Sequence, residues 1–467
     1  MLIPRLATKL KTALGPLWWY SALLFAVMRL GDLINLYIGA FLVPTWIPEG
    51  QLGVVRPLLK GVELVAIPMA FWVLTAEKYL NVFAERQELG KAKALLRDAL
   101  VSVTGLSLLV CLALAAFAPS ILVRLRLDDY QLLLWGGVLV VLTCVQPVLA
   151  SALRSFKLFN TVVLFGLPGV LVRLIAMLAL LKILFLRGFF MAQTVSAMAG
   201  ILVSGVAILW FFRRTPTPQR SYREHWAEMF RYALPLVIFT AVTQIQEPIE
   251  DLLIRQRLTA AESAASYVIK TFATIPLYFG GAVAGFLFPL VSSRFEKGEN
   301  TKRLLRQSLV VTTLLGLGFT AMLTVVGPYL VNARASWQVA VPYQHLFVWP
   351  TLLFTFRAAI TCFVLHEHAC RKFTYLRYYV PISIVQTAGL FLLMGWNAFQ
   401  SVLPEAVWRY VAMWPRDTLA FVLIWSAAFQ GVLFLVVMAH GFMVRARDNK
   451  EESSDGFQPL YRKSRGR

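Results

Sequence analysis

Long runs of apolar residues alternate with short polar segments along almost the whole chain of 467 residues. Because about 20 apolar residues cross the hydrocarbon core of a bilayer as a helix, each run has the length of a membrane span. Twelve such runs lie near residues 17–43, 61–82, 99–118, 133–153, 161–182, 189–212, 232–254, 264–290, 307–331, 340–364, 376–396 and 417–444. The first run is too long for a cleaved signal peptide, so we expect it to be retained. The pattern predicts an all-α integral membrane protein with about twelve transmembrane helices.

The composition agrees with this pattern and excludes a soluble globular protein. Hydrophobic residues make up 58% of the chain and charged residues 15%, and the mean hydropathy is +0.68. The cysteines, which form no CxxC pair, are Cys111, Cys144, Cys362 and Cys370. They support neither a disulfide framework nor a zinc site. His366 and His368 are two positions apart and point to different faces of a helix. We therefore expect no metal and no cofactor.

The net charge of +21 is distributed unevenly along the chain. Most Lys and Arg residues lie at the N-terminus and in alternate segments between spans, near residues 83–98, 154–157, 213–231, 294–306, 371–377 and 445–467. Since basic segments stay on the cytoplasmic side, both termini are predicted to be cytoplasmic. The basicity then indicates topology and an attraction to anionic membrane lipids, and no nucleic-acid partner is expected.

The sequence contains an internal repeat. Residues 95–101 (LLRDALV) align with residues 304–310 (LLRQSLV), and the alignment runs without a gap to Ala118-Pro119 and Gly327-Pro328. Upstream, Ile67-Pro68 aligns with Ile275-Pro276. Because six spans separate equivalent helices, the two halves have the same orientation in the membrane. We predict two six-helix bundles related by a pseudo-two-fold axis along the membrane normal, a parallel repeat.

The repeat and the polar segments predict the division of the chain into domains. The segment between the halves is short, charged and contains Pro216 and Pro218, as a cytoplasmic tether would. The predicted parts are an N-terminal bundle at 1–212, a linker at 213–231, a C-terminal bundle at 232–445 and a charged cytoplasmic tail at 446–467. Proteins built from such repeats bind substrates between the halves, near the middle of the bilayer.

The seventh apolar run carries acidic side chains where a lipid-facing helix would have none. At about 100° per residue, one stripe of this helix holds Gln244, Glu247, Asp251 and Arg255, with Glu250 beside it. A charge at bilayer depth costs about 2.5–3.5 kcal/mol on insertion scales, so we expect the stripe to face a wet cavity lined by protein. Pro248 predicts a kink. The alternative is a buried ion pair with Arg255 or Lys270 that only fixes helix packing.

Other spans also carry ionisable residues too deep for easy contact with the membrane surface. Arg29 and Asp32 lie within the first run, with Asn35 one turn further on. Arg173, Lys270 and Arg357 lie within the fifth, eighth and tenth runs. We expect these side chains to face the same cavity, with Lys270 as an ion-pair partner of the acidic residues. The alternative for each arginine is a packing role with bonds to backbone carbonyl groups.

Several of these features resemble a known family. The sequence YVIKTFATIPLY from Tyr267, the sequence FLFP ending at Pro289 and the sequence SRFEKGE at 293–299 are similar to the polysaccharide transporter (O-antigen flippase-like) family. That family belongs to the multidrug/oligosaccharidyl-lipid/polysaccharide flippase superfamily. The resemblance covers the chain from about Tyr20 to Val444 and implies a transporter, not an enzyme.

The resemblance also implies roles for individual residues. Relatives that flip lipid-linked sugars place an Arg and an Asp in the first span, as Arg29 and Asp32 stand here. They hold basic groups in a central cavity, where Arg173, Lys270 and Arg357 would serve this chain. The chain departs from many relatives in its acidic cluster, which consists of Glu247, Glu250 and Asp251.

We therefore expect a flippase for a lipid-linked oligosaccharide or polysaccharide precursor, working by alternating access in the bacterial cytoplasmic (inner) membrane. Basic side chains offset the desolvation of an anionic head group. The residues expected to couple transport to H⁺, Na⁺ or the membrane potential are Asp32, Glu247, Glu250 and Asp251. Membrane lipids and glycan-assembly proteins are the other expected partners of a monomer. The alternatives are a cation-coupled multidrug exporter of the same superfamily, a membrane glycan polymerase or glycosyltransferase, and an inactive scaffold in a glycan-assembly complex.

Overall fold

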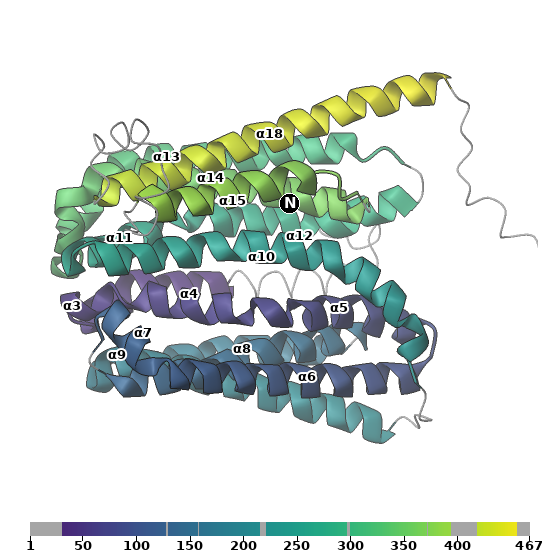
Figure 1. The fold of residues 1–467 in the computed structure, drawn as a ribbon, viewed down its shortest axis with the longest axis horizontal. Helices are drawn as coiled ribbons and strands as arrows, with labels where there is room; N and C mark the ends of the chain where they lie inside the picture. Colours follow the sequence, from purple (N-terminus) through teal and green to yellow (C-terminus); the bar gives the residue numbers. More distant parts are fainter. Residues whose placement is uncertain are drawn as a thin grey trace, which may run out of the picture.

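The computed structural model of the protein describes residues 30–127, 129–156, 158–214, 221–296, 299–370, 372–393 and 418–454. Within these ranges every regular element is a helix. The long helices lie side by side along one common direction (Figure 1). The prediction of an all-α membrane fold is therefore confirmed.

The first half of the chain begins with the short apolar helix Leu30–Trp46, which contains a π-helical turn. Its elements are, in order, η1 (Ile38–Leu42), α2 (Val43–Trp46), α3 (Glu49–Leu52), α4 (Val55–Ala66), η2 (Ile67–Met69), α5 (Ala70–Glu85), α6 (Leu89–Ala116), α7 (Ala118–Leu125), α8 (Tyr130–Ser155) and α9 (Phe159–Arg214).

The second half follows the same plan. Its elements are, in order, η3 (Arg223–His225), α10 (Trp226–Arg257), α11 (Ala260–Ala273), α12 (Ile275–Glu296), α13 (Lys302–Ala333), η4 (Ala335–Leu346), α14 (Val348–Ala369), α15 (Leu376–Leu393) and α18 (Leu419–Ser454).

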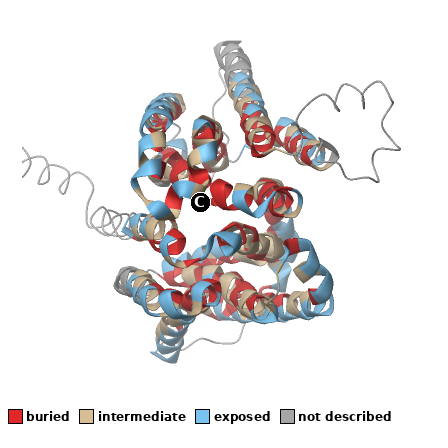
Figure 2. Cartoon of the chain, turned by 90° about the vertical axis from the view of Figure 1, so that its left-hand side faces the viewer, coloured by how far each residue is buried: buried red, intermediate tan, exposed pale blue. Residues whose placement is uncertain are grey.

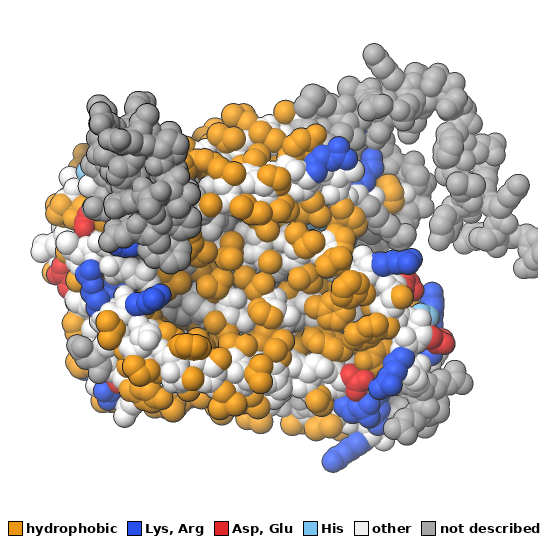
Figure 3. Space-filling view, in the orientation of Figure 1, with side chains coloured by type: hydrophobic (Ala, Val, Ile, Leu, Met, Phe, Trp, Pro, Cys, Tyr) orange, Lys and Arg blue, Asp and Glu red, His pale blue; other side chains and the backbone are white. Residues whose placement is uncertain are grey.

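The helices correspond to the predicted spans. Eight described segments are long and apolar enough to cross a membrane. One of them, Gly169–Arg214, contains two predicted spans, and Leu30–Trp46 is a shorter apolar helix. The helices α10, which carries the polar stripe, and α15 complete the arrangement. Apolar side chains cover the middle of the visible face, while charged side chains gather at its two ends (Figure 3). This distribution fits a molecule with a hydrocarbon belt.

A sharp turn separates the two predicted spans within α9. Phe185 has φ 49° and ψ −126°, a conformation that no helix contains. At Gly188 a Cβ atom would collide with the carbonyl group of Leu180, so only glycine allows the two arms to meet this closely. The chain therefore reverses between the fifth and sixth spans with almost no loop.

The internal repeat is visible in the helices themselves. The second span is interrupted by the 3₁₀ turn η2, at Ile67-Pro68. The eighth span is interrupted between α11 and α12, at the aligned Ile275-Pro276. A proline cannot donate the hydrogen bond that a continuous helix needs at its position, which explains both interruptions. The two halves therefore share their helix breaks as well as their sequence pattern.

The first helices of the second half are packed into the core of the first half. Ile249 and Leu253 of α10 belong to the same hydrophobic cluster as Leu80 of α5 and Val148 of α8. A separate cluster lies between α12, α13, α14 and α18. Viewed along the helices, buried residues lie mainly between neighbouring helices and exposed residues outside (Figure 2). The seam between the halves is consequently a packed interface, built mainly on α4, α5, α10 and α11.

Several predicted boundaries were wrong by part of a helix. The second span begins at Val55 instead of residue 61, and α10 begins at Trp226, inside the predicted linker. The helix α18 continues to Ser454, into the predicted tail. Hydropathy locates the apolar part of a helix and misses a polar start such as that of α10, where Trp226 packs against Phe71 and Trp72 of α5.

Candidate functional site

A network of charged side chains joins the two halves at the seam. Its centre is Glu247 of α10. Arg56 of α4 donates an Nη2–H to Glu247 Oε1, and Arg357 Nη1 of α14 lies 2.9 Å from Glu247 Oε2. Lys60 Nζ, one turn after Arg56, lies 3.5 Å from the same oxygen. One carboxylate therefore holds three cations from two other helices.

The second part of the network lies deeper in the protein. Lys270 Nζ of α11 lies 2.6 Å from Asp251 Oδ1 and 2.5 Å from Glu250 Oε1. Arg56 Nε donates to Asp251 Oδ2 at 3.2 Å and connects the two parts. Lys270, Glu250 and Asp251 are all buried. The pairing of Lys270 with the acidic residues that the sequence predicts is therefore present.

We call these ion-paired residues the central charge network. Its members are Arg56, Lys60, Glu63, Glu247, Glu250, Asp251, Lys270 and Arg357. Four of them are cations and four are carboxylates, so their formal charges cancel. An anion that enters such a neutral network adds negative charge, so a carboxylate that gives up its cationic partners must take up a proton or become hydrated.

One side of the central charge network is partly exposed at the protein surface. The exposed fraction of the side chain rises along α4 from 12% at Arg56 through 21% at Lys60 to 41% at Glu63. Glu247 and Arg357 are also partly exposed, whereas Lys270 is 1% exposed. Glu247 and its three cationic partners therefore form the accessible part of the network. The Lys270 ion pairs form its sealed part.

Buried glutamine side chains extend the network into the second half. Arg357 Nη2 lies 3.4 Å from Gln246 Oε1, and Gln430 Nε2 of α18 donates to the same oxygen at 2.6 Å. Gln430 Nε2 also lies 3.2 Å from Gln386 Oε1 of α15. Each glutamine was visible in the sequence as an amide within an apolar run. An amide in such a position needs a partner, so this signal was available.

The other predicted site residues do not enter the central charge network through any hydrogen bond described here. Arg173 Nη1 of α9 donates to Asn35 Oδ1 at 2.7 Å, within the first half. Asp32 is partly buried and lies within electrostatic range of Tyr278 of α12. Arg29 lies outside the described residues. The predicted residues on α10, α11 and α14 thus form one ion-paired group, and Tyr278 lies within electrostatic range of Asp32 as well as of Arg56 and Lys60.

The predicted α10 stripe is only partly buried, because Gln244 is exposed while the neighbouring Gln246 is buried. The alternative of an ion pair with Arg255 was wrong. Arg255 pairs with no carboxylate among the described residues and donates instead to backbone carbonyl groups of Leu125 and Arg126. Arg56 and Lys60 were not predicted as site residues, because the predicted second span begins after them, at residue 61. Their spacing with Glu63, at i, i+4 and i+7, was the available signal for a charged helix face.

Direct hydrogen bonds close the seam at one end of the molecule. Trp337 Nε1 donates to the carbonyl of Ala40 at 2.7 Å, and Tyr267 OH donates to that of Gly39 at 3.0 Å. Ser263 Oγ donates to the carbonyl of Gly53 at 2.9 Å. We call this the closed end. It is the end that carries α3, α7 and the start of α11, at the left of Figure 1.

The linker is anchored to the first half at the opposite end of the molecule. Tyr222 OH donates to Asp98 Oδ2 of α6 at 3.1 Å, and burial together with this contact raises the pKa of Tyr222 to about 12. The Lys91 ammonium donates to Glu224 at 2.6 Å and lowers the pKa of that carboxyl. The α6 residue Asp98 corresponds to Gln307 in the repeat, so this anchor is present in one half only.

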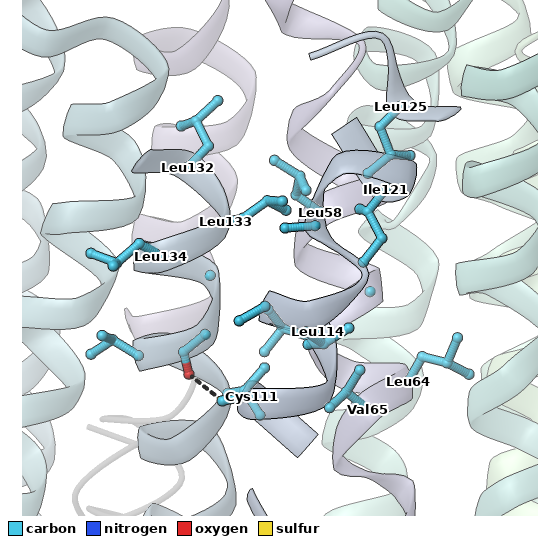
Figure 4. A pocket seen from close by; sticks show the side chains of 18 of the residues that line it. Leu58, Leu64, Val65, Cys111, Leu114, Ile121, Leu125, Leu132, Leu133 and Leu134 are labelled. Atoms are coloured by element: carbon cyan, nitrogen blue, oxygen red, sulfur yellow. Dashed lines mark hydrogen bonds between the residues drawn. The ribbon is translucent and has the colours of Figure 1, made fainter. Parts of the chain in front are cut away.

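An apolar pocket of about 440 Å³ lies within the first half (Figure 4). Leu58 and Leu64 of α4, Leu114 of α6, Ile121 of α7 and Leu133 of α8 line it. Cys111 Sγ donates to the carbonyl of Gly137 at its wall. A pocket with so few polar groups suits a hydrocarbon chain and excludes a hydrated head group.

The histidines near the end of α14 have protein partners. The ring nitrogens of His366 lie 3.1 Å from Glu367 Oε1 and 3.0 Å from Thr301 Oγ1. His368 Nε2 lies 2.6 Å from Tyr375 OH. Within the described part of the chain, no group of three or more His, Cys, Asp or Glu residues is arranged to hold a metal ion.

Comparison with known proteins identifies relatives of this sequence and of this fold. The model of the family described as "Polysaccharide biosynthesis protein" matches residues 87–342. An inward-facing multidrug resistance MATE family transporter of the MOP superfamily is 13% identical, with a TM-score of 0.68 over 89% of this chain and 96% of that one. An outward-facing transporter of the same description is 14% identical, with a TM-score of 0.60 over 92% and 96%.

A third similar structure is a MOP superfamily transporter from Pyrococcus furiosus, described by a binding pocket of reverse polarity. It is 15% identical, with a TM-score of 0.55 over 90% of this chain and 94% of that one. At such identities the likeness shows the fold alone. No curated protein matches the sequence.

Proposed function

We propose, from the premise that this chain belongs to the polysaccharide biosynthesis protein family, that it flips a lipid-linked oligosaccharide or polysaccharide precursor across the bacterial cytoplasmic membrane. Such a precursor carries an anionic, hydrated head that cannot cross hydrocarbon unaided. A route between two helix bundles would supply the head with polar partners. The internal repeat of this chain and the likeness of its fold to a MATE family transporter support this route.

The observation that carries the proposal is the partly exposed group of three cations around Glu247. We propose that the phosphate groups of the substrate replace Glu247 as the partner of Arg56, Lys60 and Arg357. Guanidinium groups bind phosphate through paired, charge-assisted hydrogen bonds, which are about twice as strong as neutral ones. Because Arg56 belongs to the first half and Arg357 to the second, a bound phosphate would contact both halves at once.

The asymmetry of the seam supports a mechanism of alternating access. We propose that the closed end faces the outside, as the distribution of Lys and Arg predicts, and that the structure represents an inward-facing state. Two observations support this. Exposure along α4 increases away from the closed end, and the TM-score is higher with an inward-facing transporter than with an outward-facing one. The phosphate groups of the substrate would then reach Glu247 and its cationic partners from the cytoplasm.

Glu250 is the carboxylate best placed for coupling to a cation. It is buried, and its one cationic neighbour in the described ion pairs, Lys270, is shared with Asp251. Glu247, in contrast, is held by three cations. We propose that H⁺ or Na⁺ exchanges at Glu250 and Asp251, with Asp32 as a further candidate in the first span. Loss of a carboxylate charge would weaken the ion pairs of Lys270 and the packing of the seam beside them.

Export in cells tests the substrate assignment. Arg56→Ala and Arg357→Ala should each abolish surface-glycan export at unchanged protein level, because each removes one phosphate partner. The control is Arg124→Ala, which removes an exposed arginine of α7 outside the network. Full export by both network variants would overturn the proposal.

A cation-coupled multidrug exporter is the second candidate. Four carboxylates in the central charge network and the likeness to MATE-fold structures favour it. A cationic drug would bind the carboxylates in place of the arginines. The variant Glu247→Gln would then lose drug efflux in a pump-deficient strain. Export of a cationic dye by the wild type, without any effect on glycan export when the gene is deleted, would select this candidate.

A further inference from the structure

Two arginines at the closed end bind across the seam in a reciprocal arrangement. Arg126 of the first half donates Nη1 to the carbonyl of Leu258 and Nη2 to that of Gln256, both at 3.2 Å. Arg255 of the second half donates Nε to the carbonyl of Leu125 at 3.0 Å and Nη2 to that of Arg126 at 3.3 Å. We call this pair of arginines the arginine clasp.

The clasp forms where two helices end against each other. The helix α7 ends at Leu125 and α10 ends at Arg257. The last carbonyl groups of a helix have no partner within it and carry a partial negative charge. Each arginine satisfies carbonyl groups at the end of the other half's helix. The clasp therefore holds only while the two helix ends remain together.

A pocket of about 620 Å³ adjoins the clasp. Among the described residues its charged lining consists of Arg126, Asp129, Arg187 and Arg255, three cations and one carboxylate with a formal charge of +2. Asp129 is ion-paired with Arg187 and also accepts from the backbone N–H of Gln131. Within this described lining, the positive charge that no carboxylate compensates belongs to the two clasp arginines.

One donor of the clasp is unused. The Nη1 atom of Arg255 is buried and has no hydrogen-bond partner among the described residues. Only 4% of the surface of Arg255 is exposed. A buried charged donor without an acceptor is costly, and it is most readily explained by an acceptor that binds there. The N–H groups held by carbonyls also become available when the clasp opens.

We propose that this pocket binds a phosphate-class oxyanion and that binding opens the clasp. Phosphate forms charge-assisted bonds with guanidinium groups, whereas the carbonyl groups that hold the clasp are neutral acceptors. A ligand shifts a conformational equilibrium only by its difference in affinity for the two states. The open state offers the anion both guanidinium groups in full, whereas in the closed state carbonyl groups hold several of their donors and Nη1 of Arg255 is buried. The anion therefore favours separation of the halves at the closed end.

The anion has two chemical sources with the same recognised group. It is either the phosphate of a phospholipid head group at the membrane surface or a free phosphate compound in solution. The inference is independent of the transported glycan, since it concerns only the clasp and the pocket beside it. Its failure and the failure of the proposed function are thus separate results.

The distance across the closed end tests the proposal. Spin labels at Val123 of α7 and Ala261 of α11, both exposed, report that distance in a protein whose four native cysteines are replaced by alanine. One sample in detergent receives sodium pyrophosphate, and a second receives phosphatidylglycerol. We expect a longer distance population to grow in at least one sample, and the responding sample identifies the source of the anion. No change in either sample overturns the proposal.

Variants separate binding from mere weakening of the seam. Arg255→Gln should show the longer distance without any anion and should need about tenfold more pyrophosphate or phosphatidylglycerol for any further change. Arg255→Lys keeps the charge and should retain part of the response. The matched control is Arg124→Gln, in the last turn of α7, two residues before Arg126 and outside the described lining of the pocket, and it should respond as the wild type does. An unaltered dose response in Arg255→Gln contradicts the proposal.

Discussion

At the scale of single residues, Glu247 has an unusual position. Its carboxylate contacts Arg56 and Arg357 directly and lies near Lys60, so three positive charges depend on one negative charge. Removing one member of a buried ion pair leaves its partner uncompensated, which costs more than the pair contributes when intact. We therefore expect the charge of Glu247 to contribute more to the stability of the seam than that of any more exposed member of the network, and Glu247 is the residue that the proposed anion would replace.

The variant Glu247→Gln should destabilise the protein by about 2–4 kcal/mol, because three cations lose their shared counter-charge. Thermal or urea unfolding of the purified protein in detergent measures this change. Glu63→Gln is the control, since Glu63 is 41% exposed and its contact with Lys60 should contribute at most about 1 kcal/mol. Pyrophosphate should restore part of the stability that Glu247→Gln loses, and it should not stabilise Glu63→Gln. Equal stability of the two variants contradicts this role for Glu247.

Some residue contacts follow from the sequence and others do not. Lys270 and the acidic residues of α10 were predictable partners because each lies at bilayer depth on its own helix. Arg56 was missed because a hydropathy window starts a span where apolar residues begin, while the helix starts earlier. The hydrogen bonds from Arg255 to Leu125 and Arg126 could not be predicted. Every residue has a backbone carbonyl group, so the sequence does not show which one accepts a hydrogen bond.

At the scale of elements, the π-helical turn η1 explains how the closed end is held. A π-helical turn shifts the backbone hydrogen-bond pattern, and such turns occur often at functional positions. The carbonyl groups of Gly39 and Ala40, within η1, accept from Tyr267 and Trp337 of the second half. The first span thus offers backbone acceptors, and the second half supplies the donors.

The variant Trp337→Phe keeps the ring but removes the donor to Ala40. We expect the closed state to lose about 1 kcal/mol, so that the closed end opens several-fold more often. The alkylation rate of a cysteine at Thr271, which is buried close to Gly39, measures this opening with a membrane-impermeant reagent. The rate should rise in Trp337→Phe. An unchanged rate would show that this hydrogen bond does not hold the seam.

The linker anchor should depend on pH. Lys91 lowers the pKa of Glu224, so the anchor is fully present above the ordinary carboxyl value of 4.5 and is lost as pH falls through the lowered value in the folded protein. Hydrogen exchange of residues 221–226 measures this. Protection should exceed that of Glu224→Gln at neutral pH and should approach it in acid. A constant difference between the two proteins at all pH values contradicts the prediction.

At the scale of the whole molecule, most of the architecture could be predicted from the internal repeat. The alignment of residues 95–119 with 304–328 predicted two halves of like orientation, and the shared breaks at Pro68 and Pro276 agree with it. The fold follows because each half must satisfy its backbone within helices. The asymmetries between the halves were not predictable, since they arise from contacts at the seam such as the anchor of Tyr222 on Asp98.

We propose that the cations around Glu247 bind the anionic head of the substrate while the substrate crosses the membrane. Liposomes containing the purified protein and a fluorescent lipid diphosphate-linked oligosaccharide measure this step directly, as the fraction of substrate that becomes accessible on the opposite side. The double variant Arg56→Ala, Arg357→Ala should slow this movement by about tenfold or more, while Arg124→Ala, outside the network, should match the wild type. Movement of the glycolipid at the wild-type rate in the folded double variant would contradict the account.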